Sequence, residues 1–549
     1  MSRNTDNHFG LAPMKNIGRS SFKRPCLHST SFNTGDIVPF YVDEVLPGDT
    51  CKMKTSALIR MTTPINPVMD NAWMDTYYFF VPRRLVWEHW EEFMGENKTD
   101  AWTQQSEYQI PQVTSPEGGW TKGTIAEKIT GCQGRKLSLD ACYFRAYALI
   151  FREWFRNENV TEPPEVPLGD ATTSGSNGSD YVTDLAKGGM MAKAVKYADY
   201  FTRALPEPQK GPDIYLPLGT TAPLTANSAS IDGLGLVKGI YSATGDLIRL
   251  EKFNAGGTFN IDETTPQAAG TQIGGIGVTT ENMSADLTGI GVDLTNASAA
   301  TINQLRQAFA VQRMYEVDAR GGTRYTEILR AHFGVVSPDS RLQRPEYLGG
   351  KRTPINITQV IQQSSTDATS PQGTAAAYSL TIDVHEDFTK SFTEHGIIMG
   401  LCVIRTEHSY QQGLNRMFSR KDRLDFYFPE LSNIGEQGIL NKEIFAQGTA
   451  EDDEIFGYQE AWAEYRYGIN KISGELNSDY ATPLDSWTYA DDFDSLPTLS
   501  DDFIRETNVN VARTLAIQNQ DQWIANFYFD QTWIRPMPIY SIPSLTGWN

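Results

Sequence analysis

Histidines and clustered carboxylates are the residues of this chain that could bind a metal or transfer protons. His385 and His395 have glutamates beside them, but the two histidines are ten positions apart, which does not fit the helical spacing of a zinc hydrolase. The acidic run 451–454 lacks the alternating ligands and the turn glycine of a calcium loop, so we interpret it as a solvated face. No phosphate-binding loop and no nucleophile elbow occurs. The sequence therefore predicts no enzyme, no metal site and no cofactor.

Basic side chains are the second group of residues that could bind a partner. They stand out because the whole chain carries a formal charge of −20. Beyond residue 318, arginines alternate with glycine, proline and aromatic residues at a spacing that builds no active site. Such a surface fits other copies of the chain or a polyanion. The subunit-interface candidates in this segment are Arg320, Arg324, Arg341, Arg344 and Tyr347.

Two further basic segments are predicted to contact single-stranded DNA. Residues 1–35 carry five basic groups against one acid, and residues 416–423 interleave basic residues with Met417 and Phe418. Phosphate pairing and base stacking hold single strands without sequence preference. The alternatives are an ordinary frayed terminus and arginines that pair with carboxylates at subunit contacts. The DNA-contact candidates are Arg3, Lys15, Arg19, Lys23, Arg24, Arg416, Arg420, Lys421 and Arg423.

The elements that would position these residues are mainly β-strands. Aromatic and β-branched residues, in places alternating with polar ones, predict strands at 37–42, 53–61, 73–81, 378–384, 397–404, 424–428 and 523–540. Strands this far apart must pair non-locally, which favours a Greek-key sandwich over a meander.

Several helices interrupt the strand pattern. Apolar residues at helical spacing predict helices at 85–94, 139–157 and 185–205, with Ser138 as the N-cap of the second. A capping box at 301–304 opens another helix, which Gly321 and Gly322 end. Their aromatic faces are expected to cover a sheet or a neighbouring subunit.

Residues 231–300 differ in composition from the rest of the chain. Twelve of these seventy residues are glycine, and the aromatic residues among them are Tyr241, Phe253 and Phe259. A segment with so little to bury is expected to be a surface excursion.

The overall composition restricts the class of protein. With 40% hydrophobic residues the chain is globular, yet no uncharged apolar run reaches the roughly 18 residues of a membrane helix. The N-terminus has no apolar core typical of a secretory signal. The five cysteines form no C-x-x-C pair, which indicates a reducing compartment rather than a disulfide framework.

Six segments spread along the chain are IVPFYVDEVLPGDT, TPINPVMDNAWMDTYYFFVPRRLVWEHWEEFMGE, DARGGTRYTEILRAHFGVVSPDSRLQRPEYLGG, FTEHGIIMGLCVIR, YQQGLNRMFSRKDRLDFYFPEL and GYQEAWAEYRY. They resemble the major capsid proteins of microviruses, small single-stranded-DNA phages, in their gokushovirus branch. They occur in the same order as in that family, whereas residues 228–294 match no segment of it.

The resemblance implies a mainly β fold, the eight-stranded jelly roll of viral shells with long inserted loops and several helices. It implies a basic N-terminal arm inside the shell (1–35), a first part of the jelly-roll core with helical insertions (36–222), a Gly-rich surface insertion that forms a three-fold projection and carries Tyr241, Phe253 and Phe259 (223–296), and the remainder of the core with interface loops (297–549).

The resemblance also implies a set of partners and a location. Other copies of the chain would form an icosahedral shell around a single-stranded DNA genome, together with minor virion proteins. The insertion would bind a host surface receptor, and the chain would enter no membrane. The subunit is expected to assemble in the host cytoplasm and to reside in the virion.

Two alternatives remain at this stage. A secreted-type β-sandwich that binds or cleaves carbohydrate would fit the size, acidity and abundant Trp and Tyr. A pair of carboxylates for glycoside hydrolysis remains open, because their separation cannot be read from a sequence. A tail or spike protein would show internal repeats, and none is visible.

Overall fold

The chain forms two compact units, one made of residues 1–210 with 316–549 and the other of residues 211–315. The predicted insertion at 223–296 falls within the second unit, and its role as a three-fold projection stays a prediction. The computed structural model describes residues 18–96, 108–212, 224–226, 237–241, 247–252, 290–292, 302–322, 325–334, 343–364, 366 and 372–540.

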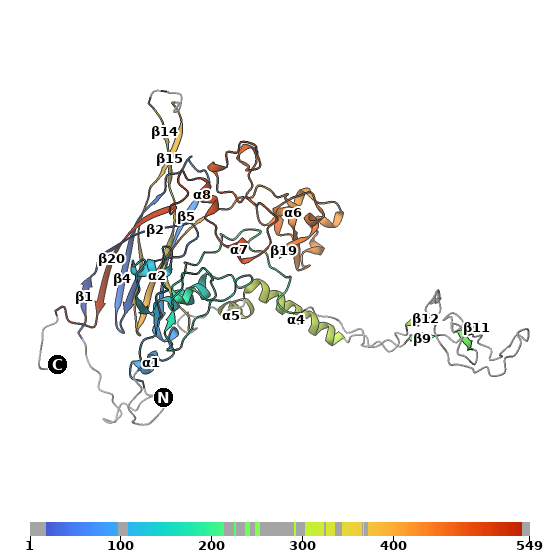
Figure 1. Cartoon of the computed structure of the whole chain (residues 1–549), viewed down its shortest axis with the longest axis horizontal. Coiled ribbons are helices and arrows are strands. Elements are labelled where there is room, and N and C mark those ends of the chain that lie inside the picture. Colours follow the sequence, from blue (N-terminus) through green and yellow to red (C-terminus); the bar gives the residue numbers. More distant parts are fainter. Residues whose placement is uncertain are drawn as a thin grey trace, which may run out of the picture. The chain divides into compact units, whose positions relative to one another are not determined.

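Two antiparallel sheets form the centre of the first unit (Figure 1). The larger sheet follows the order β1 (Ser20–Lys23), β20 (Trp523–Arg535), β4 (Thr50–Met61) and β16 (Thr381–Ser391), and β2 (Cys26–Phe32) also pairs with β20. The second sheet follows the order β13 (Glu346–Pro354), β5 (Ala72–Pro82), β17 (Gly396–Thr406) and β3 (Val38–Val45). The prediction of a mainly β fold is confirmed. The count of eight strands stays a prediction, because five and four strands are described in these two sheets.

An aromatic core joins the two sheets. The ring of Phe40 on β3 lies 4.7 Å from that of Phe527 on β20, and the hydroxyl oxygens of Thr55 on β4 and Tyr78 on β5 are 2.7 Å apart. Trp523 and Trp533 of β20 are fully buried. A buried Phe contributes roughly 1.5–3 kcal/mol, so this layer of rings fixes one sheet on the other.

Helix α3 (Ala141–Ile150) packs against β17, which is buried along nearly its whole length. The carboxylate of Asp140 caps the helix by accepting a hydrogen bond from the backbone N–H of Cys142 at 2.8 Å. The predicted cap, Ser138, is wrong, because that residue belongs to the short strand β7. The helix continues as one π-helical turn, Phe151–Phe155.

The other helices and strands are short, except α4. This helix begins within the predicted capping box and ends at the predicted glycine pair. The helices are α1 (Trp90–Phe93), α2 (Ile125–Thr130), α4 (Ile302–Gly321), α5 (Tyr325–Phe333), α6 (Asn441–Ile444), α7 (Asp501–Ile504) and α8 (Val509–Arg513). The small strand groups of the first unit are β14 (Ile357–Ile361) with β15 (Ala375–Ser379), β18 (Glu436–Leu440) with β19 (Ile455–Glu460), and β6 (Gln112–Thr114) with β7 (Ser138–Asp140) and β8 (Thr173–Ser174). Those of the second unit are β9 (Leu224–Ala226) with β12 (Ile290–Val292) and β10 (Val237–Tyr241) with β11 (Leu247–Lys252).

The helix predicted at 185–205 is wrong. Only Leu185–Lys187 forms a helical turn, which ends at Gly188 with a φ of +73°. Beyond that glycine the backbone forms isolated antiparallel bridges to distant segments, which take up the hydrogen bonds that a helix would use. These bridges join Lys193 to Asp36, Val195 to Arg505 and Leu205 to Tyr458.

Two other predictions need correction. Residues 424–428 form no strand, because the first two belong to the 3₁₀ turn Arg423–Asp425 and the other three lead into the next turn, Pro429–Leu431. The helix expected at 85–94 is reduced to α1 after a separate turn. Within the predicted N-terminal arm 1–35, β1 and β2 pair with β20, and the place of this arm inside the shell stays a prediction.

Candidate assembly and nucleic-acid surfaces

Three of the five predicted interface residues lie in the described part of the chain, and each has a contact within the same chain. The Arg320 guanidinium at the end of α4 pairs with the buried Glu436 of β18. The guanidinium of Arg344 stacks 4.4 Å from the centre of the Trp154 ring. The ring of Tyr347 on β13 lies 5.7 Å from that of Phe79. Arg324 and Arg341 lie outside the described residues, and the interface role of all five stays a prediction.

The aromatic residues around Tyr347 enclose a small hollow on the second sheet. Its volume is about 310 Å³, and its lining consists of Tyr77, Phe79, Trp154, Phe155, Val195, Tyr347 and Arg405. Arg405 is held by Asp75 and by the hydroxyl of Tyr77, 2.8 Å away. Burial raises the pKa of Tyr77 to about 12, so this hydroxyl stays protonated. The hollow can accept an apolar side chain and offers no reactive group.

The arginines predicted to contact DNA at 416–423 pair within the chain. Arg416 donates to the carbonyl of Gly438 at 2.9 Å, and Arg420 pairs with Glu464 at 3.0 Å. Arg423 lies over the ring of Phe428, 5.1 Å from its centre. Arg420 therefore fits the alternative to DNA contact, in which these arginines pair with carboxylates. Its partner Glu464 belongs to the same chain, however, and not to a neighbouring subunit.

The same segment exposes apolar side chains together with the basic residues Lys421 and Arg423. Met417, Phe418 and Leu424 are 52%, 64% and 71% exposed, and Lys421 is exposed beside them. Neighbouring apolar side chains at a surface are typical of a protein contact.

The N-terminal basic residues differ from one another in their surroundings. Arg19 donates to the hydroxyl of Thr50 at 2.7 Å, and Arg24 pairs with Asp43 at 2.8 Å. Lys23 is exposed and makes no ion pair with any described residue. Arg3 and Lys15 lie outside the described residues. As DNA contacts, all five stay predictions.

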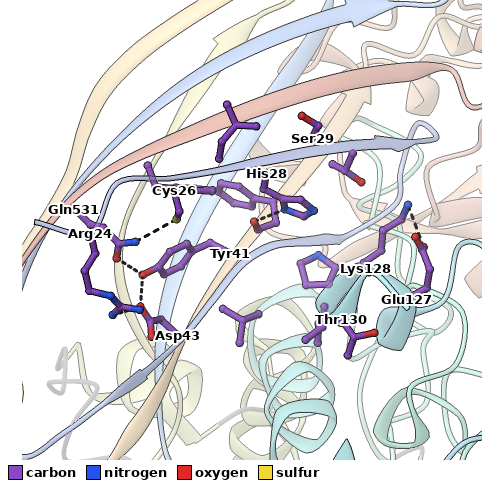
Figure 2. Close-up of a pocket in the computed structure, with 18 of the residues that line it drawn as sticks. Arg24, Cys26, His28, Ser29, Tyr41, Asp43, Glu127, Lys128, Thr130 and Gln531 are labelled. Atoms are coloured by element: carbon purple, nitrogen blue, oxygen red, sulfur yellow. Dashed lines mark hydrogen bonds and ion pairs between the residues drawn. The ribbon is translucent and has the colours of Figure 1, made fainter. Parts of the chain in front are cut away.

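Beside Arg24, strands β2 and β3 and helix α2 enclose a hollow of about 770 Å³ (Figure 2). At one end the hydroxyl of Tyr41 lies 2.7 Å from Gln531 Oε1 and 3.0 Å from Asp43 Oδ2. Nδ1 of His28 bonds to the carbonyl of Phe40 at 2.7 Å. Burial raises the pKa of the Cys26 thiol and of the Tyr41 hydroxyl. The hollow is polar and its thiol is protonated, so it suits binding rather than catalysis.

The histidines considered as metal ligands do not converge. Nδ1 of His385 lies 2.6 Å from Asp383 and Nε2 lies 2.8 Å from Asp387, and Asp383 also accepts from Lys351. His395 instead packs against the ring of Trp90, and its pKa is lowered by burial. Among the residues that the structure describes, no group of His, Cys, Asp and Glu could hold a metal ion.

A buried ionic network around His408 was not predicted. Nδ1 of His408 lies 2.9 Å from Asp491 and Nε2 lies 3.0 Å from Glu506. Lys196 pairs with Asp491 at 3.2 Å, and Asn510 donates to it at 2.6 Å. Burial lowers the pKa of His408, but the two carboxylates outweigh this effect and raise it to about 10. His408 is therefore an imidazolium at neutral pH that ties four distant segments together.

Known proteins match the chain over its full length. The family model described as "Capsid protein (F protein)" matches residues 12–545. The capsid protein VP1 of Bdellovibrio phage phiMH2K is 41% identical and the match covers 100% of this chain and 99% of the relative. The VP1 proteins of Chlamydia phage 1 and Spiroplasma virus 4 are each 39% identical, with 98% of this chain covered and 98% and 97% of the relatives.

The chain belongs to the phage F capsid protein family. The predicted microvirus resemblance is thereby confirmed, and so is the prediction that the chain is no enzyme. Family membership also removes the carbohydrate-active alternative. The capsid protein is a structural component of the virion. None of its described helices is both long and apolar enough to cross a membrane.

Two features of the capsid protein gave no signal in its sequence. The partners of His408 are 83 and 98 positions away, so no local spacing marks the network. The hollow beside Arg24 combines β2, β3 and α2, whose proximity depends on the fold of the sheets. Neither feature could be found without the tertiary structure.

Proposed function

We propose that this capsid protein associates with other copies of itself into an icosahedral shell that encloses single-stranded DNA, accompanied by minor virion proteins. The match to microvirus VP1 proteins along the whole chain carries this proposal. Self-association is further supported by apolar side chains exposed around residue 418 and by the aromatic hollow beside Tyr347, since interface anchors are typically aromatic residues and arginines.

Assembly is tested by sedimentation and negative-stain microscopy of the purified full-length chain. Closed shells of uniform size, or rings that build toward them, are the expected result. Particles isolated from an infected host provide the second arm, because minor virion proteins are part of the proposal. A chain that stays monomeric alone and is absent from such particles would overturn it.

For the genome contact we propose the basic N-terminal residues, because Lys23 is exposed and makes no ion pair with a described residue. The sharpest variant is Lys23→Glu combined with Arg3→Glu and Lys15→Glu, since Arg19 and Arg24 also hold the sheet edge. The DNA content of each particle, read from absorbance at 260 and 280 nm, is expected to fall while particles still form. The matched control reverses three exposed basic residues elsewhere, Arg60, Arg135 and Lys136. Unchanged DNA content in the triple variant would contradict this assignment.

For host attachment we propose the Gly-rich segment 223–296, which lies within the second unit. Exposed loops on a rigid scaffold commonly carry recognition. Replacing the segment with a short flexible linker is expected to leave particle yield unchanged and to reduce adsorption to host cells. If the linker variant forms no particles, the segment is an assembly element instead.

A further inference from the structure

Strands β14 and β15 form a two-stranded ribbon, here called the arm, that extends past the end of the larger sheet (Figure 1). The base of the arm is fixed, because the N–H of Ile355 donates to the carbonyl of Ala72 at 2.8 Å and that of Asn356 donates to the hydroxyl of Thr381 at 2.9 Å. Farther from this base, β14 and β15 form an antiparallel pair with each other, from Ile357 opposite Ser379 to Ile361 opposite Ala375. The arm is thus an extension of β16 that is fixed at its base and whose outer part has little of its own chain to pack against.

One face of the arm is apolar and exposed. Val360 and Tyr378 are 44% and 51% exposed and project to the same side, because Val360 pairs with Ala376 and residues 376 and 378 share a face of the strand. The same face continues along β16 through Ile382 and Val384, which are 65% and 52% exposed. Leu58 of β4 lies directly opposite Ile382. The apolar surface therefore runs from the arm onto the sheet.

The two strands of the arm also lack charge. Between residues 353 and 382 the sequence has one charged residue, Asp367, which lies between the two strands in sequence, in a chain whose formal charge is −20. A two-stranded ribbon is marginally stable alone in water, and uncharged strand edges pair readily with other chains. An uncovered arm would therefore unfold easily or pair with the wrong chain. A partner that covers the arm prevents both.

We propose that the arm docks on a second copy of this chain. Two copies that each carry a charge of −20 repel each other, so they meet best through surfaces without carboxylates, and the arm is such a surface. A nucleic acid would need cations, which the arm does not have. This inference rests on the proposed self-assembly and adds to it the element that reaches from one subunit to the next.

The first test adds charge to the apolar face with Val360→Glu and Tyr378→Glu. Particle yield is expected to fall roughly tenfold or more, because two buried unpaired charges oppose docking, while circular dichroism and thermal melting of the subunit stay as in the wild type. The control Gln133→Glu with Thr121→Glu adds the same charge at two exposed positions away from the arm. The conservative pair Val360→Thr and Tyr378→Phe is expected to assemble normally. Normal yield of the Glu variant would overturn the inference.

The second test identifies the partner directly. A benzophenone amino acid at position 378 is activated by light in particles assembled from equal amounts of ¹⁴N- and ¹⁵N-labelled chains. Cross-linked dimers that contain one chain of each label are expected. Cross-links to DNA, to another virion protein or only within one chain would overturn the inference.

Failure of the arm contact can be distinguished from failure of self-assembly. If wild-type particles form and the arm variants form them equally well, only the arm inference falls. If the wild-type chain forms no particles, the proposed self-assembly falls and the arm loses its partner with it.

Discussion

The paired sheets and the loop-rich region 407–522 are stabilised by different interactions. Between the sheets, aromatic side chains from strands far apart in sequence stack in one continuous core. The loop-rich region has a much smaller apolar cluster, around Phe456 and Phe503, and the ionic network of His408 ties its segments to one another. Glu506 of this network also accepts a hydrogen bond from the hydroxyl of Thr406, the last residue of β17, at 2.8 Å. Loops whose described strands are one short pair, β18 with β19, offer no broad apolar face, so paired charges take its place. The comparison predicts that the two regions respond to different perturbations.

The largest effect is expected in the aromatic core. Phe527→Ala removes a fully buried ring between the sheets and should lower the free energy of unfolding by about 4 kcal/mol, measured by urea titration of unassembled subunits. Its neighbour Tyr528 points to the opposite face of the same strand and is 43% exposed, so Tyr528→Ala should cost less than about 1 kcal/mol. Equal costs would mean that the core does not join the sheets as described.

The second effect concerns the ionic network. His408→Ala leaves Asp491 and Glu506 buried without their shared cation and should cost about 3 kcal/mol in the same titration. His332, which pairs with Asp318 at 2.8 Å, provides the control. Because that pair is less buried, His332→Ala should cost less than about 1 kcal/mol. A His408→Ala variant as stable as the control would show that the network stabilises nothing.

The third effect is a pH dependence of the free energy of unfolding, which comes from the loop-rich region and not from the aromatic core. The pKa of His408 is raised in the folded chain to about 10 from its ordinary 6.5, so its stabilisation is complete below pH 6.5 and is lost as the pH rises through 10. Between pH 7 and pH 8, below the range in which the buried thiols of Cys51, Cys142 and Cys402 lower stability in the same direction, the free energy of unfolding should fall by at most about 1.4 kcal/mol. In the His408→Ala variant this slope should be absent, whereas Phe527→Ala should keep it. A wild-type chain without the slope would contradict the charged state of His408.

The smallest effect is expected at an exposed ion pair of the sheet edge. Arg24→Ala removes the pair with Asp43, in which the arginine side chain is 43% exposed, and should cost less than about 1 kcal/mol. The urea midpoint at 50 mM and 500 mM salt should differ little between variant and wild type. A cost above 2 kcal/mol would mean that Arg24 stabilises the hollow beside β2 as well.

The sequence predicted best where local pattern and tertiary structure agree. The strand at 73–81 and the helix that follows residue 301 lie where aromatic density and the capping box placed them. The helix at 185–205 was wrong, because bridges to distant segments override a helical pattern of apolar residues. The sequence also contained Arg416 and Arg420, but their carboxylate partners, Glu443 and Glu464, lie 27 and 44 positions away and became visible only in the folded chain.

The position of β20 has a consequence for protein synthesis. This strand comes last among the described elements, yet it lies between β4 and the N-terminal strands β1 and β2. While the ribosome is still translating, β4 and β2 therefore lack their common neighbour and expose unpaired edges. Only a chain translated through Arg535 can complete the larger sheet. A prematurely terminated chain would have no finished sheet, so incomplete subunits would be kept out of a growing shell.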